Sequence, residues 1–214
     1  VYRVQHDHRS DEQEGEADVI LINTCSVREH AEDRVFSRLG HLRRLKAKRP
    51  DVVIGVIGCM AQKEGEDLVR RMPHVDLVCG THQYPLVPRM VRSLQEGGPP
   101  IVSVDEADAE SIDAPRNPRA RAVAHHAYVL AMKGCDCRCT FCVVPYTRGV
   151  ELSRPIPEVV AEAAGLVADG VVEVTLLGQN ITSYGKNLSP TAPQHPLVDA
   201  RPERQPVHWE VNLA

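Results

Sequence analysis

Hydrophobic and polar positions follow two alternating patterns along the first part of the chain. Short, nearly continuous apolar runs occupy 18–23, 52–57 and 75–78, and such runs are typical of strands buried on both faces of a parallel sheet. Between the first two runs, apolar residues recur every three or four positions over 31–45, with basic residues between them. This spacing predicts an amphipathic helix that ends near Pro50.

The second and third runs are separated by another helical pattern that passes through Leu68 and Val69. Strands that alternate with helices predict an α/β fold, here a small doubly wound parallel sheet within residues 1–96. Over 97–127 the apolar period gives way to glycine, proline, acidic residues and arginine. We expect this segment to be a linker.

A second α/β unit is expected over 128–185. It would consist of a strand at 128–132, a cysteine-rich loop, a helix at 157–168 and a strand at 171–177. This segment is too short for a complete barrel of eight strands. The rest of the chain, 186–214, is rich in proline and has little to bury, so we expect it to be disordered.

Composition excludes several classes of protein. With 43% hydrophobic and 25% charged residues, the chain is typical of globular proteins. Its formal net charge of −4 excludes a protein that is basic overall and wraps around nucleic acid. No apolar stretch reaches the roughly 18 residues of a membrane helix, and the first thirty residues do not resemble a signal peptide. Seven cysteines without a regular framework indicate a reducing compartment. We therefore expect a cytoplasmic protein without a membrane partner.

The strongest chemical signal is a loop with three cysteines directly after the strand predicted at 128–132. Cys135, Cys139 and Cys142 form the pattern CxxxCxxC. Three thiolates on one short loop suit a [4Fe-4S] cluster and leave its fourth iron without a protein ligand. The alternatives are a zinc site, which usually has four ligands, and ordinary core cysteines. Cys137 lies inside the loop, and we expect it to be a spectator.

Two further cysteines follow predicted strands. Cys25 and Cys59 each come two residues after a buried run, so both are expected at the carboxyl edge of the sheet, where open α/β sheets bind ligands. They could share a metal site, although each alone would more often be a buried small apolar residue. Cys79 also ends a predicted strand, and we expect it to be buried in the core.

The cysteine loop resembles the radical S-adenosylmethionine (SAM) enzymes, whose signature also places an aromatic residue, here Phe141, before the last cysteine. Four other segments narrow the resemblance to the methylthiotransferases: Asn-Thr-Cys-Ser-Val-Arg-Glu at 23–29, Gly-Cys-Met-Ala-Gln at 58–62, Val-Val-Pro-Tyr-Thr-Arg-Gly at 143–149 and Leu-Leu-Gly-Gln-Asn at 176–180. The resemblance implies that the second unit begins a radical SAM partial barrel. It also implies a chain truncated at both ends.

The resemblance further implies two [4Fe-4S] clusters and SAM as cofactors. Cys135, Cys139 and Cys142 would hold the cluster that binds SAM, while Cys25 and Cys59 would hold part of a second cluster whose third cysteine is missing from this chain. Phe141 would help to bind the cofactor, and Gln179 and Asn180 are candidates to line the SAM pocket, although the last two could equally form a polar turn at the strand end. The reaction would add a methylthio group to carbon 2 of N(6)-dimethylallyladenosine beside the anticodon of tRNA.

The expected partners are the tRNA anticodon stem-loop and a reductant such as flavodoxin or ferredoxin, with the protein itself a monomer. Two basic clusters could meet RNA phosphates or simply be solvated surface: Arg43, Arg44, Lys46, Lys48 and Arg49 in the first, and Arg116, Arg119 and Arg121 in the second. Alternative functions are a sister enzyme that acts on threonylcarbamoyl-adenosine or a ribosomal-protein aspartate, and an inactive metal-binding fragment.

Overall fold

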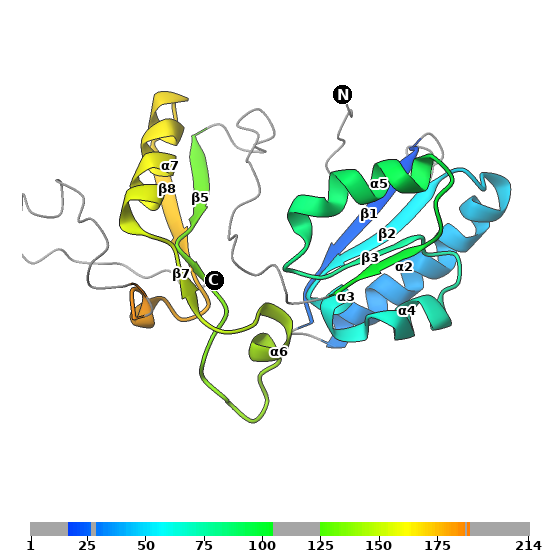
Figure 1. The fold of residues 1–214 in the computed structure, drawn as a ribbon, viewed down its shortest axis with the longest axis horizontal. Coiled ribbons are helices and arrows are strands. Elements are labelled where there is room, and N and C mark those ends of the chain that lie inside the picture. Colours follow the sequence, from blue (N-terminus) through cyan, green and yellow to red (C-terminus); the bar gives the residue numbers. More distant parts are fainter. Residues whose placement is uncertain (1–16, 27–28, 105–124, 187, 189–214) are drawn as a thin grey trace, which may run out of the picture. The chain divides into compact units, whose positions relative to one another are not determined.

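The structure is a computed structural model that describes residues 17–26, 29–104, 125–186 and 188. The described residues form two compact units (Figure 1). One unit contains the described residues up to 104 together with Lys133–Leu152, and the other contains 125–132 and the described residues from Ser153 onward. The cysteine loop therefore belongs to the same unit as the amino-terminal sheet.

The amino-terminal sheet has four parallel strands in the order β1-β2-β3-β4. Its strands and helices along the chain are β1 (Val19–Thr24), α2 (Glu29–Lys48), β2 (Val53–Gly58), α3 (Cys59–Glu64), α4 (Glu66–Arg71), β3 (Leu77–Cys79), the 3-10 turn η1 (Tyr84–Leu86), α5 (Val87–Gln95) and β4 (Ile101–Ser103). Helices and strands alternate as the apolar runs predict, which confirms the α/β fold class.

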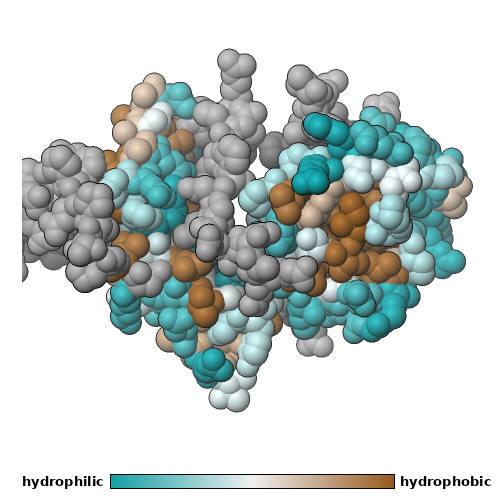
Figure 2. Space-filling view, viewed as in Figure 1, coloured by the Kyte–Doolittle hydropathy of each residue, from teal (hydrophilic) through white to brown (hydrophobic). Residues whose placement is uncertain are grey.

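Helices cover both faces of this sheet. On one face, α2, α3 and α4 pack against alternate strand residues such as Ile54, Val56 and Val78. On the other face, α5 packs its Met90 and Val91 against β3. The second face is only partly covered, because Leu21 of β1 remains 39% exposed and apolar residues reach the surface beside α5 (Figure 2).

The second unit is built around a parallel strand pair. Strand β5 (His126–Leu130) pairs with β8 (Glu173–Leu177), and α7 (Ile156–Ala168) connects them and packs on β5. The short strands β6 (Met132–Lys133) and β7 (Leu152–Ser153) pair on either side of the cysteine loop. The 3-10 turn η3 (Ile181–Ser183) follows β8. The helix α6 (Val144–Arg148), which follows the last cysteine, belongs to the unit of the amino-terminal sheet.

Some sequence predictions need correction. The segment assigned to the linker contains β4, whose Ile101 pairs with Leu77, and the start of β5 at His126. The sequence pattern misses both, because β4 directly follows Gly-Gly-Pro-Pro and β5 begins with a histidine, so the apolar signal is weak there. The helix α5 carries an apolar pattern that the sequence prediction did not use. The expected tail, apart from Lys186 and Leu188, lies outside the described residues.

No helix in the described ranges combines the length and apolar character that crossing a membrane requires.

Candidate cluster site in the cysteine loop

Backbone and side-chain hydrogen bonds close the cysteine loop. The amide of Cys135 donates to the carbonyl of Gly149 across the base (3.2 Å), and the amide of Glu151 donates to Asp136 Oδ1 (3.0 Å). Within the loop, the amide of Cys142 donates to the carbonyl of Cys139 (3.0 Å). The loop thus holds its first and last cysteines on one closed turn.

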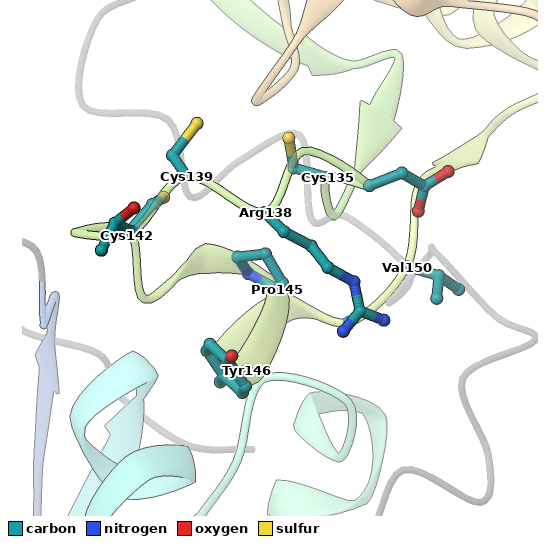
Figure 3. A pocket seen from close by; sticks show the side chains of 10 residues that line it. Cys135, Arg138, Cys139, Cys142, Pro145, Tyr146 and Val150 are labelled. Carbon is teal, nitrogen blue, oxygen red and sulfur yellow. The ribbon is translucent and has the colours of Figure 1, made fainter.

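The three cysteines of the CxxxCxxC pattern line one open cavity of about 540 Å³. Figure 3 shows the thiols of Cys135 and Cys139 on the same side of the loop, while the side chain of Arg138 extends to the other side, toward Val150. Cys139 is exposed, and Cys135 and Cys142 are half-buried. The remaining lining residues are Asp136, Thr140, Pro145, Tyr146 and Gly149.

The donor chemistry of this cavity fits an iron-sulfur cluster. None of the seven cysteines forms a disulfide, so the three cavity thiols are available as ligands. Thiolates are the ligands of such clusters, and accessible thiols can receive one. In the described part of the chain, no three histidine, cysteine or carboxylate side chains already converge on a metal-sized point. Cluster binding would therefore require the side chains of this loop to turn inward.

Two other loop residues differ from their neighbours. Phe141 is 93% exposed and is not among the residues that line the cavity, so its predicted contact with a cofactor stays a prediction. Cys137 is exposed and likewise does not line the cavity. Its expected role as a spectator stays a prediction.

The sheet edge brings Cys25 and Cys59 to matching positions. Thr24 and Gly58 are the last register partners of β1 and β2, and the two cysteines follow them directly. Cys25 is exposed, whereas Cys59 is buried at the start of α3. The carboxyl edge of the sheet therefore carries both predicted ligands, with different access to solvent.

Cys79 lies in the core, as expected. It packs with Leu77, Met90 and Val91 on the face that α5 covers, and its side chain is fully buried. Burial raises the pKa of the Cys79 thiol to about 11, because the thiolate loses its hydration there. A neutral, enclosed thiol is a packing residue and a poor ligand.

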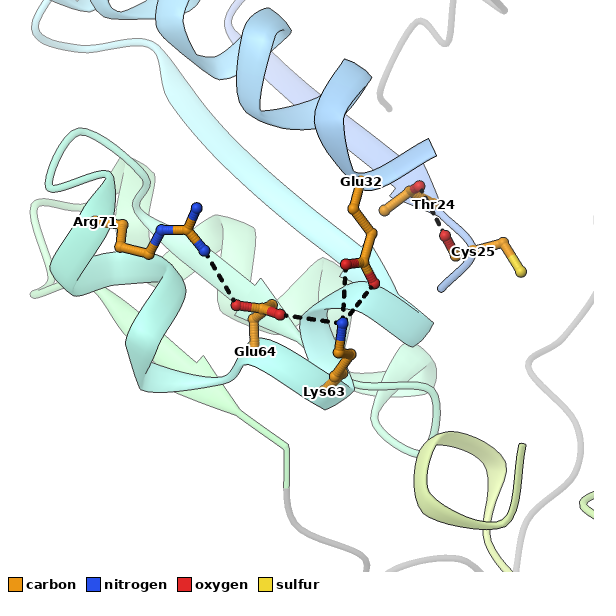
Figure 4. A network of polar contacts seen from close by, with 6 residues as sticks. All are labelled: Thr24, Cys25, Glu32, Lys63, Glu64 and Arg71. Atoms are coloured by element: carbon orange, nitrogen blue, oxygen red, sulfur yellow. Dashed lines mark hydrogen bonds and ion pairs between the residues drawn. The ribbon is translucent and has the colours of Figure 1, made fainter. Parts of the chain in front are cut away.

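An ionic network joins the helices beside Cys25 (Figure 4). Lys63 of α3 lies 2.9 Å from Glu32 of α2 and 3.5 Å from Glu64, and Arg71 reaches Glu64 at 3.5 Å. The ammonium of Lys63 donates a hydrogen bond to Glu32, and this bond raises the pKa of Lys63 because it favours the charged form. This network links α2 to α3, and it positions the helix that begins at Cys59.

Gln179 and Asn180 follow β8 in the other unit. The side-chain oxygen of Gln179 is buried and has no hydrogen-bond partner among the described residues. Asn180 accepts a hydrogen bond from the hydroxyl of Thr182 (2.8 Å) and shapes the turn. Their predicted contact with SAM stays a prediction.

The cations of the first basic cluster fall into two groups: some are paired within the fold and the others are exposed. Lys46 pairs with Asp76 (2.8 Å), and Arg49 bonds the carbonyl of Ala17 (3.0 Å) and Asp18 (3.2 Å). These two cations stabilise the fold, because they tie α2 to the ends of neighbouring strands. The exposed cations left on this helix end are Arg43, Arg44 and Lys48. The second cluster, Arg116, Arg119 and Arg121, lies outside the described residues.

Sequence reasoning missed the residues on which the loop rests. Thr81 and His82 follow β3 and contact the segment after the cysteines, and Arg138 and Tyr146 line the cavity. The position of Thr81 and His82 just past a strand end was a usable signal, because that edge is where α/β sheets place functional residues.

The fold and the site define an α/β protein with a solvent-accessible, thiol-lined cavity. Residues 3–80 match the sequence model described as "Uncharacterized protein family UPF0004". The chain is also similar to proteins named tRNA-2-methylthio-N(6)-dimethylallyladenosine synthase, which confirms the likeness to methylthiotransferases.

Three of these relatives illustrate the extent of the match. The protein of Nitrosomonas eutropha is 50% identical over 169 residues, which are 79% of this chain and 38% of that protein. The protein of Alkalilimnicola ehrlichii is 51% identical over 170 residues, covering 79% and 37% respectively. The protein of Burkholderia thailandensis is 47% identical over 184 residues, covering 86% and 39%. The chain thus matches less than half the length of these curated relatives.

Proposed function

We propose that the protein is a tRNA methylthiotransferase that adds a methylthio group to carbon 2 of N(6)-dimethylallyladenosine. The observation that carries the proposal is the loop in which Cys135, Cys139 and Cys142 line one cavity, within a chain about half identical to enzymes named for this product. The relatives' names favour this substrate over threonylcarbamoyl-adenosine or a ribosomal-protein aspartate.

Cys135, Cys139 and Cys142 would hold a [4Fe-4S] cluster, and the fourth iron would remain open for SAM. When bound, the cluster and SAM supply the one-electron chemistry that activates an otherwise inert carbon–hydrogen bond. Cys25 and Cys59 would hold part of a second cluster as the source of sulfur. The chain's own role is then to bind, orient and enclose these groups.

Two side chains of the cavity suit an anionic, aromatic substrate. Arg138 brings a guanidinium to the cavity wall, where it can pair with a carboxylate or a phosphate. Tyr146 lines the same cavity and is 74% exposed, and an exposed ring can stack on an unpaired base. In the other unit, the buried amide oxygen of Gln179 suits a polar donor on a ligand.

Arg43, Arg44 and Lys48 are the described cations of the first basic cluster that we assign to RNA, since Lys46 and Arg49 are engaged within the fold. Contacts of this kind bind phosphates without reading sequence. We also propose a flavodoxin or ferredoxin as the electron donor, because the cluster chemistry needs single electrons at low potential.

The test is turnover by protein reconstituted anaerobically with iron and sulfide. With a strong reductant and SAM, we expect 5'-deoxyadenosine, and with an anticodon stem-loop that carries N(6)-dimethylallyladenosine we expect RNA heavier by one methylthio group. Stem-loop RNA with threonylcarbamoyl-adenosine and a ribosomal-protein peptide serve as substrate controls. Iron binding without any 5'-deoxyadenosine would overturn the proposal in favour of a non-catalytic metal-binding protein.

A further inference from the structure

The turn after β3 contacts the segment that follows the cysteines. The hydroxyl of Thr81 donates a hydrogen bond to the backbone carbonyl of Thr147 in α6. The imidazole of His82 lies against Gly149, with Cε1 3.2 Å and Nε2 3.4 Å from the position that a Cβ on Gly149 would occupy. Since Gly149 has φ +73, a side chain at this position would be strained as well as crowded.

These contacts enclose one end of a short helix. Thr147 is 1% exposed and His82 is 6% exposed, whereas Cys137 and Cys139 in the loop ahead are exposed. The helix α6 also packs against α3, whose first residue is Cys59. The buried end of α6 is therefore held by the amino-terminal sheet, and the loop that carries the three thiols extends from this anchored helix.

We propose that Thr81 and His82 are positioning residues that hold α6, and through it the Cys135–Cys142 loop, beside the sheet edge that carries Cys59. The functional consequence rests on the proposed function: two thiol sites can act on one adenosine only if their separation is fixed. Neither residue touches the reacting atoms in this proposal. Their role is to keep SAM cleavage coupled to methylthio transfer.

The anchor is tested first on the full chain without iron, by hydrogen exchange of the amides in 143–149. Thr81→Val keeps the shape of the side chain but removes the donor, while Thr81→Ser keeps the donor. Loss of one hydrogen bond should speed exchange about three- to tenfold in the valine variant, and the serine variant should match the parent. Unchanged exchange in Thr81→Val would overturn the proposal.

The packing of His82 is tested in the same way. His82→Ala should also speed exchange in 143–149, whereas His41→Ala, at an exposed position of α2, should not. Protection in α2 and β2 is followed in every variant, so that general unfolding is recognised. If loss of protection in His82→Ala spreads equally over α2 and β2, His82 is a fold residue, and the positioning role is wrong for it.

The coupling is tested on reconstituted protein as the ratio of 5'-deoxyadenosine to methylthiolated RNA. Thr81→Val should form 5'-deoxyadenosine within about twofold of the parent rate, but the ratio should rise at least about threefold. Thr81→Ser should restore the parent ratio. An unchanged ratio in Thr81→Val contradicts the proposal. If the parent forms neither product, the proposed function fails while the exchange experiment still decides whether the anchor exists.

Discussion

Thr24 and Gly58 are register partners at the carboxyl ends of adjacent parallel strands, and each is followed directly by a cysteine. The pairing is close: a Cβ on Gly58 would lie 2.6 Å from the carbonyl oxygen of Thr24 and 2.6 Å from Asn23 Oδ1. Gly58 also has φ 102 and ψ −161, a region that residues with side chains rarely adopt. The junction of β2 and α3 therefore requires glycine next to Cys59.

Gly58→Ala should lower the free energy of unfolding by at least about 2 kcal/mol, because the strained backbone alone costs about 1–3 kcal/mol and the clash adds to it. Gly40→Ala is the matched control, since Gly40 lies within α2 with nothing in contact range of an added Cβ. It should raise stability by about 0.5–1 kcal/mol. Urea unfolding followed by circular dichroism measures both, and equal midpoints would contradict the assignment.

Lys46→Met should destabilise the amino-terminal unit by about 1–3 kcal/mol. The ammonium of Lys46 lies 2.8 Å from Asp76 and 2.7 Å from the carbonyl of Val52. Asp76 also accepts a hydrogen bond from the backbone amide of Ile54. Lys48→Met, at an exposed position, should change stability by less than about 0.5 kcal/mol.

The same two lysine variants distinguish an effect on the stability of the fold from an effect on RNA binding. If Lys48 contacts RNA, Lys48→Met should weaken binding of an anticodon stem-loop and reduce its salt dependence. Binding is compared over a range of salt concentrations with the parent. If Lys46→Met weakens RNA binding but leaves the free energy of unfolding unchanged, then Lys46 contacts RNA and its ion pair with Asp76 does not stabilise the fold.

The sequence pattern predicts some elements of the fold and misses others. Apolar runs predict β1, β2 and β3 to within about two residues, because consecutive apolar side chains mark each strand. β2 and β3 are buried, whereas β1 is only half-buried. They miss β4, because it directly follows Gly-Gly-Pro-Pro and ends in the polar Ser103. They could have found α5, since Val87, Val91 and Leu94 repeat with helical spacing.

The sequence pattern could not predict which residues far apart in the chain contact each other. The basic residues of α2 form one cluster in the sequence, and only the fold brings Asp76, 30 residues away, to Lys46. Likewise the three loop thiols follow from their spacing, but the contact of Thr81 with Thr147 joins residues 66 positions apart. The candidate ligands and the basic cluster are therefore predictable from the sequence, whereas the long-range contacts that hold them in place are not.

The thiol of Cys79 should resist alkylation at pH 8, where the exposed Cys137 reacts. Burial raises the pKa of Cys79 from 9.0 to about 11, so labelling without unfolding should begin only as the pH approaches that value. The stability that the buried neutral thiol contributes is fully present below pH 9.0 and is lost as the pH rises through about 11. Mass spectrometry of labelled peptides gives both rates, and equal labelling at pH 8 would refute the buried placement.

Arg154→Met should strongly destabilise the second unit. Arg154 is 4% exposed, it lies 2.5 Å from Glu162, and it donates to the carbonyl of Leu130 at 2.9 Å. Removing it leaves Glu162 without this cation, which typically costs about 3–5 kcal/mol. Glu158→Gln is the control, because its carboxylate is exposed and 3.9 Å from Arg154, and the change should stay below about 0.5 kcal/mol. The urea midpoint for loss of amide protection in α7 measures both.

A cluster in the cysteine loop is tested most directly by the amount of iron bound after anaerobic reconstitution with iron and sulfide. The parent is compared with the triple variant in which Cys135, Cys139 and Cys142 are alanine, and with Cys137→Ala as the matched control. We expect at least about four irons per chain in the parent and in Cys137→Ala, and about four fewer in the triple variant. A second cluster at Cys25 and Cys59 would bring the parent to about eight irons. Equal iron in the parent and the triple variant would contradict a cluster in the cysteine loop.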